Sequence, residues 1–250
     1  MPSRRPRVAW AGEATRPRLF PVTFFDVGVP LRVVSYNVHS LRDDRGALAA
    51  VVRSLEPDVL IVQEAPRRFR WRTKCARLAR SFGLYYGTGG LPSLGNLILT
   101  NLRVRVRESW ELRYPLIAGR HMRGAAFARC TVPGAAPFVV AGSHLSTYDG
   151  ERPGQAALLE PALRAASDPV ILGIDLNETD GGASWKLLAA DLVDSGRDGG
   201  NTFPAGAPDR RIDAILVDRR IGVSHFEVAN TAQALRASDH LPLVADLILP

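Results

Sequence analysis

The sequence is poor in cysteine and contains no long apolar run, and each shortage excludes a class of protein. Two cysteines in 250 residues cannot form the disulfide framework of a small secreted domain, and their spacing matches no zinc finger. We therefore expect Cys75 and Cys130 to be small buried thiols. No stretch approaches the roughly 20 apolar residues of a membrane span. The longest apolar stretch near the N-terminus, Val8 to Ala11, is too short for a signal-peptide core, so we expect a cytoplasmic protein.

Lysine is also scarce, and arginine carries the positive charge. The 32 lysine and arginine residues include only Lys74 and Lys186 as lysines, and the formal net charge is +7. The guanidinium group suits bidentate contact with phosphate, and the net charge favours anionic partners. A composition of 46% hydrophobic and 23% charged residues is typical of globular proteins, and the length suits one domain with a large core.

The pattern of apolar residues divides the chain into a basic, proline-containing arm (1–30) and one domain (31–250). We expect the arm to be poorly ordered. Strand and helix patterns alternate at the start of the domain, and strand patterns dominate after Gly83. So many uninterrupted strands favour an α+β fold with two stacked sheets and helices on the outside. The predicted helices are 48–55, 71–82, 155–166 (with an irregularity at Pro161) and 184–190; the predicted strands are 31–38, 58–64, 84–87, 96–100, 104–112, 125–132, 137–144, 170–174, 212–217, 224–229 and 243–249.

Polar residues, which would be unfavourable in an apolar core, stand at the ends of these apolar strands. If the strand ends meet at one edge of a sandwich, the residues form one cluster of carboxylates, amides and imidazoles. Mg²⁺ takes oxygen ligands, a buried carboxylate can activate water, and an imidazole paired with a carboxylate can stay protonated. The sequence contains no Gly-x-Ser-x-Gly elbow and no Walker loop. The residues of the predicted cluster are Asn37, Glu64, Asn96, His144, Asp175, Asn177, Asp213, Asp239 and His240.

Taken in order, these motifs resemble the endonuclease/exonuclease/phosphatase superfamily, also called deoxyribonuclease I-like. Each motif alone is weak, and the ordered set is specific. The resemblance covers residues 31–250 and implies a four-layer αββα sandwich whose site lies at one end of two mainly antiparallel sheets. The motifs are Ser35-Tyr-Asn37-Val, Val62-Gln-Glu64, Gly95-Asn96, Arg123-Gly-Ala, Ser143-His144-Leu, Gly173-Ile-Asp175-Leu-Asn177, Arg211-Ile-Asp213 and Ser238-Asp239-His240.

The resemblance also implies a metal and a role for each residue. Glu64 would be the main ligand of Mg²⁺, or of Mn²⁺ in its place, helped by Asn37 and Asp239. Five further residues would be catalytic. Asp175 and Asn177 would contact the attacking water, and His240, oriented by Asp213, would contact the scissile phosphate. His144 would be a second imidazole on that phosphate. Asn96 and Arg123 match positions that some relatives use near the substrate.

Two departures from the family pattern stand beside the predicted site. Ile174 and Leu176 occupy places where the usual motif has glycine and an aromatic residue, which predicts altered packing with the chemistry kept. His39 stands where relatives that repair abasic sites in DNA usually have an aspartate, which weakens the hypothesis that this protein is such a repair enzyme. We expect His39 and His121 at the surface or rim, and His225 to pack within a strand.

The segment Arg67–Lys74 is the best indication of substrate. Its basic residues could follow a phosphate backbone, and Arg70 and Trp71 are its predicted substrate contacts. The alternative is that Trp71 points into the core, as its helical spacing with Cys75 suggests, and that the arginines form a solvated face.

The leading hypothesis is a divalent-metal-dependent phosphodiesterase that hydrolyses DNA or RNA by water attack. One alternative is a phosphomonoesterase, or a phosphodiesterase acting on phospholipid or small molecules. A second alternative is a non-catalytic nucleic-acid-binding module. We expect a phosphate-ester substrate as the partner, and the sequence indicates no obligatory protein partner.

Overall fold

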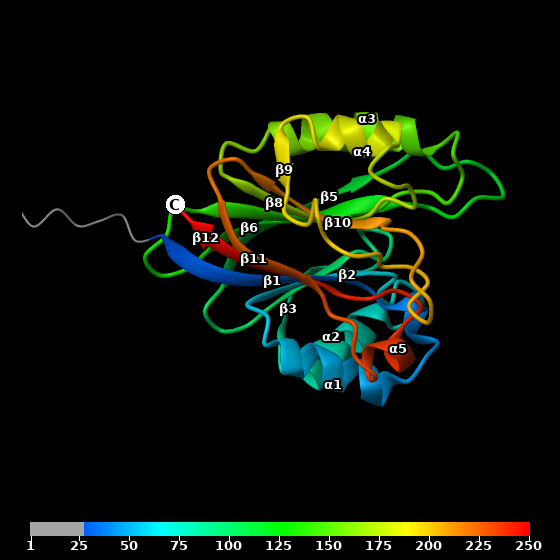
Figure 1. Cartoon of the computed structure of the whole chain (residues 1–250), viewed down its shortest axis with the longest axis horizontal. Coiled ribbons are helices and arrows are strands. Elements are labelled where there is room, and N and C mark those ends of the chain that lie inside the picture. Colours follow the sequence, from blue (N-terminus) through cyan, green and yellow to red (C-terminus); the bar gives the residue numbers. More distant parts are fainter. Residues whose placement is uncertain (1–27) are drawn as a thin grey trace, which may run out of the picture.

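Two six-stranded sheets lie face to face, and helices cover the outer face of each (Figure 1). The computed structural model describes residues 28–250. The αββα sandwich expected from the sequence is therefore confirmed. The predicted arm lies outside the described residues except for its last three, and the first strand already begins at Val29.

The first sheet has the order β11-β12-β1-β2-β4-β3. Strands β1 and β2 are parallel, while β4 and β12 run antiparallel to them. The carboxyl ends of β1 and β2 therefore lie at the same end of the sheet as the amino ends of β4 and β12. The strands are β1 (Val29–Asn37), β2 (Val59–Gln63), β3 (Tyr85–Gly89), β4 (Leu97–Thr100), β11 (Gly222–Val228) and β12 (Leu243–Leu249).

The second sheet repeats this arrangement in the order β5-β6-β7-β8-β10-β9. Strands β7 and β8 are parallel, with β6 and β10 antiparallel beside them. The short strand β9 was not predicted from the sequence. The strands are β5 (Arg105–Arg113), β6 (Gly124–Thr131), β7 (Phe138–His144), β8 (Val170–Asp175), β9 (Leu192–Asp194) and β10 (Asp213–Asp218).

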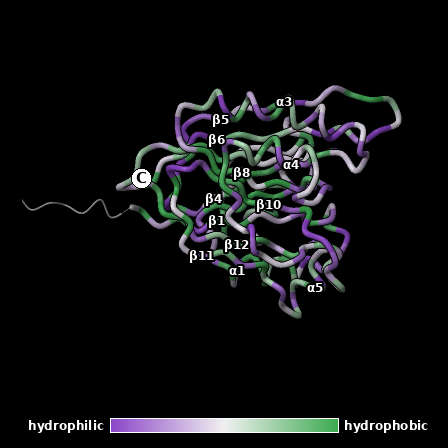
Figure 2. The backbone as a smooth tube through the Cα atoms, turned by 45° about the horizontal axis from the view of Figure 1, so that its top comes forward, coloured by the Kyte–Doolittle hydropathy of each residue, from purple (hydrophilic) through white to green (hydrophobic). Residues whose placement is uncertain are grey.

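Three apolar layers hold the sandwich together, because alternate side chains of each strand point to opposite faces. Val33 and Ile61 lie between the sheets, whereas Val34 and Leu60 face the helices of the first sheet. Figure 2 shows the hydrophobic segments inside the molecule and hydrophilic ones mainly in its outer loops. Helices α1 (Arg45–Leu55), α2 (Trp71–Phe82) and α5 (Ala234–Ala237) pack on the first sheet, and α3 (Arg152–Arg164) and α4 (Ala183–Leu188) pack on the second.

Local sequence explains the main helices. Asp44 caps α1 by accepting hydrogen bonds from the backbone N–H groups of the first turn. Gly83 ends α2 in the left-handed conformation that glycine adopts without a steric penalty. Pro161 lies inside α3, as the sequence indicated. The short helix α5 was missed, because four residues carry too little periodicity to predict a helix.

Two glycines allow the sheets to approach closely near the end that carries the polar residues. A Cβ at Gly173 would lie 2.8 Å from both Ile61 Cδ1 and Ser35 Oγ, and one at Gly142 would lie 2.7 Å from Ile61 Cγ2. Any larger residue would push the sheets apart, because packed interiors leave no spare volume. Among the described residues, no helix is long and apolar enough to cross a membrane.

Candidate active site

The polar strand ends predicted from the sequence meet at one end of the sandwich. Asp175, at the end of β8, pairs in register with His144 of β7 on one side and Asp213 of β10 on the other. Asn37 reaches them from the opposite sheet, at the end of β1. The parallel pairs and their antiparallel neighbours place these side chains together.

Asp175 is the centre of this network. Its Oδ2 accepts hydrogen bonds from Asn37 Nδ2 at 2.8 Å and from His144 Nε2 at 3.1 Å, and its Oδ1 accepts one from the Asn177 backbone N–H at 2.9 Å. Burial alone would raise the pKa of this carboxyl, but His144 and His240 outweigh it and hold the pKa well below its usual range. Asp175 is therefore an ionised, oriented carboxylate with 1% exposure.

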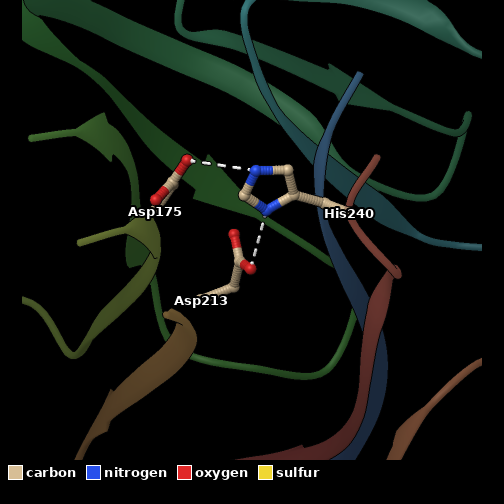
Figure 3. A group of neighbouring side chains, drawn as sticks. All are labelled: Asp175, Asp213 and His240. Atoms are coloured by element: carbon tan, nitrogen blue, oxygen red, sulfur yellow. Dashed lines mark hydrogen bonds and ion pairs between the residues drawn. The ribbon is translucent and has the colours of Figure 1, made fainter. Parts of the chain in front are cut away.

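His240 lies between two carboxylates (Figure 3). Its Nδ1 is 2.9 Å from Asp213 Oδ2, and its Nε2 is 3.8 Å from Asp175 Oδ2. The Thr202 hydroxyl donates a 2.6 Å hydrogen bond to the same Asp213 oxygen. Burial lowers the pKa of His240, but Asp213 and Asp175 outweigh burial and raise it to about 10. Burial also raises the pKa of Asp213; we place the shared proton on His240, which has a carboxylate near each ring nitrogen.

His144 has the opposite protonation state. Arg123 NH1 donates to His144 Nδ1 at 3.0 Å. Because a guanidinium can only donate, the proton of the neutral ring lies on Nε2, which is 2.9 Å from the Asn177 side-chain amide and 3.1 Å from Asp175 Oδ2. Burial and the charge of Arg123 lower the pKa of His144. The site therefore combines a neutral imidazole that orients Asp175 with an imidazolium, His240, that can donate to an anion.

Glu64 follows β2 and lines the cleft in front of this network. Burial raises the pKa of Glu64, but nearby positive charge, including that of Arg123, and a 2.8 Å hydrogen bond from Ser40 Oγ outweigh it, so the pKa is lowered and the group is a carboxylate. Asp239 also lines the cleft, with 37% of its side chain exposed. Asn37 Oδ1 accepts a hydrogen bond from the His39 backbone N–H at 3.0 Å.

Two groups of side chains could hold a metal ion. Asp175, Asp213 and His240 are all buried and offer ligand atoms within 4.8 Å of one another, but donors already contact both oxygens of Asp175 and Oδ2 of Asp213. The second group is Glu64 and Asp239, which line the cleft. Oxygen donors with few other partners suit a hard cation better, so the second group fits a divalent metal.

The backbone is strained around the same residues. The non-glycine residues with left-handed φ include the three consecutive residues His39 (44°), Ser40 (53°) and Leu41 (60°), together with Glu64 (59°) and Asn177 (51°). Such conformations cost of the order of 1–3 kcal/mol each and persist only where the surroundings hold them. Here the hydrogen bonds from Ser40 to Glu64 and from Asn177 to Asp175 hold them.

A cleft of about 1040 Å³ lies beside this network, and Asp175, Asp213 and His240 are not among its lining residues. Glu64, Asp239 and Arg123 line it, and His39 and His121 lie at its surface as expected. Two residues that support the site, Ser40 and Thr202, were not predicted from the sequence. The hydroxyl group of each donates a hydrogen bond to a carboxylate that is distant in sequence, and no spacing pattern predicts such a contact.

Three predicted substrate contacts do not join the cluster. Asn96 is buried, and its amide donates to the carbonyls of Ser93 and Gly124, bracing the turn before β4. Trp71 packs against the helix-side core of the first sheet, which is the alternative raised by its helical spacing. Arg70 is exposed but does not line the cleft.

The departures from the family pattern also have a structural basis. Ile174 and Leu176 are fully buried in the core between the second sheet and its helices. They flank Asp175 and point away from the cleft, because neighbouring strand residues face opposite sides. His225, predicted to pack within a strand, has 55% of its side chain exposed in β11, so that prediction is wrong.

Comparison with known proteins agrees with this architecture. The structure resembles an endonuclease/exonuclease/phosphatase family protein from Bacteroides thetaiotaomicron, with 17% identity and a TM-score of 0.74 over 89% of this chain and 99% of that one. It also resembles the mannosyl-6-phosphatase of the same organism, at 17% identity and a TM-score of 0.71 over 88% and 100%. A third neighbour, from Beutenbergia cavernae, is 24% identical, with a TM-score of 0.69 over 88% and 72%.

No curated protein is a significant match to this chain. The model of the Endonuclease/Exonuclease/phosphatase family matches residues 34–240, which include every residue of the network from Asn37 to His240. Members of this family are phosphoester hydrolases. The sequence motifs, the sandwich and the family match agree: the chain belongs to the Endonuclease/Exonuclease/phosphatase family.

Proposed function

We propose that this protein is a divalent-metal-dependent phosphodiesterase that hydrolyses nucleic acid by direct attack of water on phosphorus. The observation that carries the proposal is the pairing of opposite charges in the buried network beside the cleft. Asp175 is an oriented carboxylate, and protonated His240 lies 3.8 Å from it. One group can take a proton and the other can donate to an anion, which hydrolysis of a phosphate ester requires.

Each residue of the network has a role in this proposal. Asp175 orients the attacking water and takes its proton, while Asn37 and His144 fix the carboxylate. His240 donates from Nε2 to an oxygen of the phosphate, where negative charge grows in the transition state, and Asp213 keeps it protonated. Because the surrounding protein excludes most water, these fixed charges act more strongly than they would in solution.

Glu64, Asp239 and Asn37 would hold the metal in this proposal. A bound Mg²⁺ or Mn²⁺ supplies Lewis-acid stabilisation of the phosphate charge. The low pKa of Glu64 supports this assignment, because a ligand carboxylate must be ionised at neutral pH. Two carboxylates suffice, since Mg²⁺ keeps several waters and takes phosphate oxygens as further ligands.

The cleft favours a nucleic-acid substrate over a small ester. Its lining contains many more cations than a single phosphate group can contact. The small-ester alternative draws support from the structural similarity to a mannosyl-6-phosphatase. The non-catalytic alternative is disfavoured, because a chain that only binds nucleic acid has no need for the buried arrangement of Asp213, His240 and Asp175.

A substrate panel tests the proposal. Purified protein is incubated with plasmid DNA, RNA, bis-p-nitrophenyl phosphate and p-nitrophenyl phosphate in Mg²⁺, Mn²⁺ or chelator, beside His240→Ala. We expect metal-dependent cleavage of nucleic acid that His240→Ala lowers by several orders of magnitude. Turnover of the monoester alone would instead establish the phosphatase alternative. Binding of nucleic acid without any hydrolysis would establish the non-catalytic module.

A further inference from the structure

A row of cationic side chains continues the cleft away from the catalytic network. Glu64 and Asp239 line the cleft, whose walls also include Ser81 near the end of α2. The loop after β2, the start of α1 and one face of α2 supply these walls. The cations that line them, here called the basic groove, are Arg42, Arg45, Arg67, Arg68, Lys74 and Arg77.

The side chains of the basic groove lack carboxylate partners. Within residues 28–250, none of the six forms an ion pair, although ion pairs occupy many arginines elsewhere, such as Arg32 with Asp246 and Arg211 with Asp194. Arg45 and Arg67 donate only to backbone carbonyls. Cations gathered without counter-charges repel one another, so this arrangement favours an anionic ligand.

Nearby acidic residues do not neutralise the groove. Within its lining the only carboxylates are Glu64 and Asp239, and neither belongs to α2. Asp43 lies 2.7 Å from His39 Nδ1, and Asp44 is occupied in capping α1. The positive charge of the groove is therefore uncompensated along α2.

Helix α2 directs one consistent face at the groove. Lys74, Arg77, Leu78 and Ser81 line it, and positions three, four and seven apart lie on the same side of a helix. Arg80 belongs to the same helix and is exposed, but it does not line the groove. The chain thus offers a matched control for any charge removed from this face.

We propose that the basic groove binds the phosphate backbone of a single nucleic-acid strand over several nucleotides beyond the scissile phosphate. This inference rests on the proposed function and names the substrate as an extended strand. Six cations spread along a cleft match a series of phosphates, whereas one phosphate ester needs only the residues beside Glu64. The concave shape disfavours a lipid bilayer, which would require a convex or flat basic surface.

Binding of oligothymidylates in chelator tests the groove separately from hydrolysis. Fluorescence anisotropy compares labelled 12-mer and 3-mer strands on the full-length protein, the double variant Lys74→Gln/Arg77→Gln, and Arg80→Gln. Each phosphate contact to a single strand contributes about 0.7 to the slope of log affinity against log salt, so six contacts give about 4. We expect the double variant to lower the slope for the 12-mer by about 1.4 and to lose most of the affinity gained between 3-mer and 12-mer. Arg80→Gln should retain both the wild-type salt slope and the wild-type gain in affinity from 3-mer to 12-mer.

An unchanged slope and length dependence in the double variant would overturn the inference. Binding of phosphatidylserine vesicles that the double variant abolishes, without any binding of the 12-mer, would also overturn it in favour of a membrane surface. Circular dichroism melting confirms that the variants fold, which is expected because both substituted side chains are exposed. If the wild type binds the 12-mer as predicted but cleaves no nucleic acid, strand binding by the basic groove is confirmed and the proposed function is wrong.

Discussion

Removing the charge of Asp213 tests why His240 is protonated. Asp213 is the nearer of its two carboxylate partners, at 2.9 Å against 3.8 Å for Asp175. In Asp213→Asn the amide oxygen can still accept the hydrogen bond from Nδ1, so the ring keeps its position while the charge is lost. A close opposite charge raises an imidazole pKa by about 1–3 units. We expect the pKa of His240 to fall from about 10 by about 2 units, equal to about 3 kcal/mol.

The pH dependence follows from the sign of this shift. The folded-state pKa of His240 is raised above its unfolded value of 6.5, so the stabilisation is fully present below pH 6.5 and is lost as the pH rises through about 10. If catalysis needs the imidazolium, wild-type activity should also decline only as the pH approaches 10. In Asp213→Asn, both declines should move down to about pH 8.

Nuclear magnetic resonance of labelled histidine measures the pKa directly, since the chain has only five histidines. Asp218→Asn is the matched control, because Asp218 lies at the other end of β10 and pairs with Arg220. This control should leave the His240 titration unchanged. A His240 pKa in Asp213→Asn that equals the wild-type value would refute the reasoning, because the charge of Asp213 would then have no part in protonating the ring.

Three further substitutions test separate parts of the account. Thr202→Val removes the 2.6 Å donor to the buried Asp213 and should lower the free energy of unfolding by about 1–3 kcal/mol in urea titrations; no change would mean that water replaces the hydroxyl. Glu64→Gln should weaken Mg²⁺ binding in calorimetry by at least about tenfold, whereas undiminished binding would place the metal elsewhere. Gly173→Ala should destabilise the fold by about 1–3 kcal/mol, because its Cβ would meet Ile61 between the sheets, and an unchanged melting temperature would contradict that packing.

The sequence predicted the fold well because its strands are long and its polar strand ends are distinctive. The parallel pair β1 and β2 follows from an alternation of strand and helix that the sequence displays. The elements that it missed are the 3₁₀ helix His39–Leu41, β9 and α5, which have three or four residues each and depend on tertiary contacts. The exposed position of His225 was also missed, because alternation does not tell which face of an edge strand meets solvent.

The candidate site was predictable as a set of residues, but not as a network. The expectation that polar residues at strand ends cluster together grouped Asp175, Asp213 and His240 correctly. No pattern could indicate that one histidine is protonated and the other neutral, since that depends on Arg123 contacting His144 Nδ1 at 3.0 Å. Long-range contacts of this kind arise only when the chain is folded. For the same reason, the sequence alone does not tell which face of α2 lines the cleft.

In the proposed mechanism, Asp175 positions water for direct attack on phosphorus. Single-turnover hydrolysis in ¹⁸O-labelled water, with mass spectrometry of the phosphate product, tests this step. We expect one ¹⁸O atom per phosphate product for the wild type, and a rate several orders of magnitude lower for Asp175→Asn with the fold preserved. With a DNA substrate, a first-turnover product without ¹⁸O would contradict attack of water on phosphorus, and an undiminished rate in Asp175→Asn would remove this carboxylate from the mechanism.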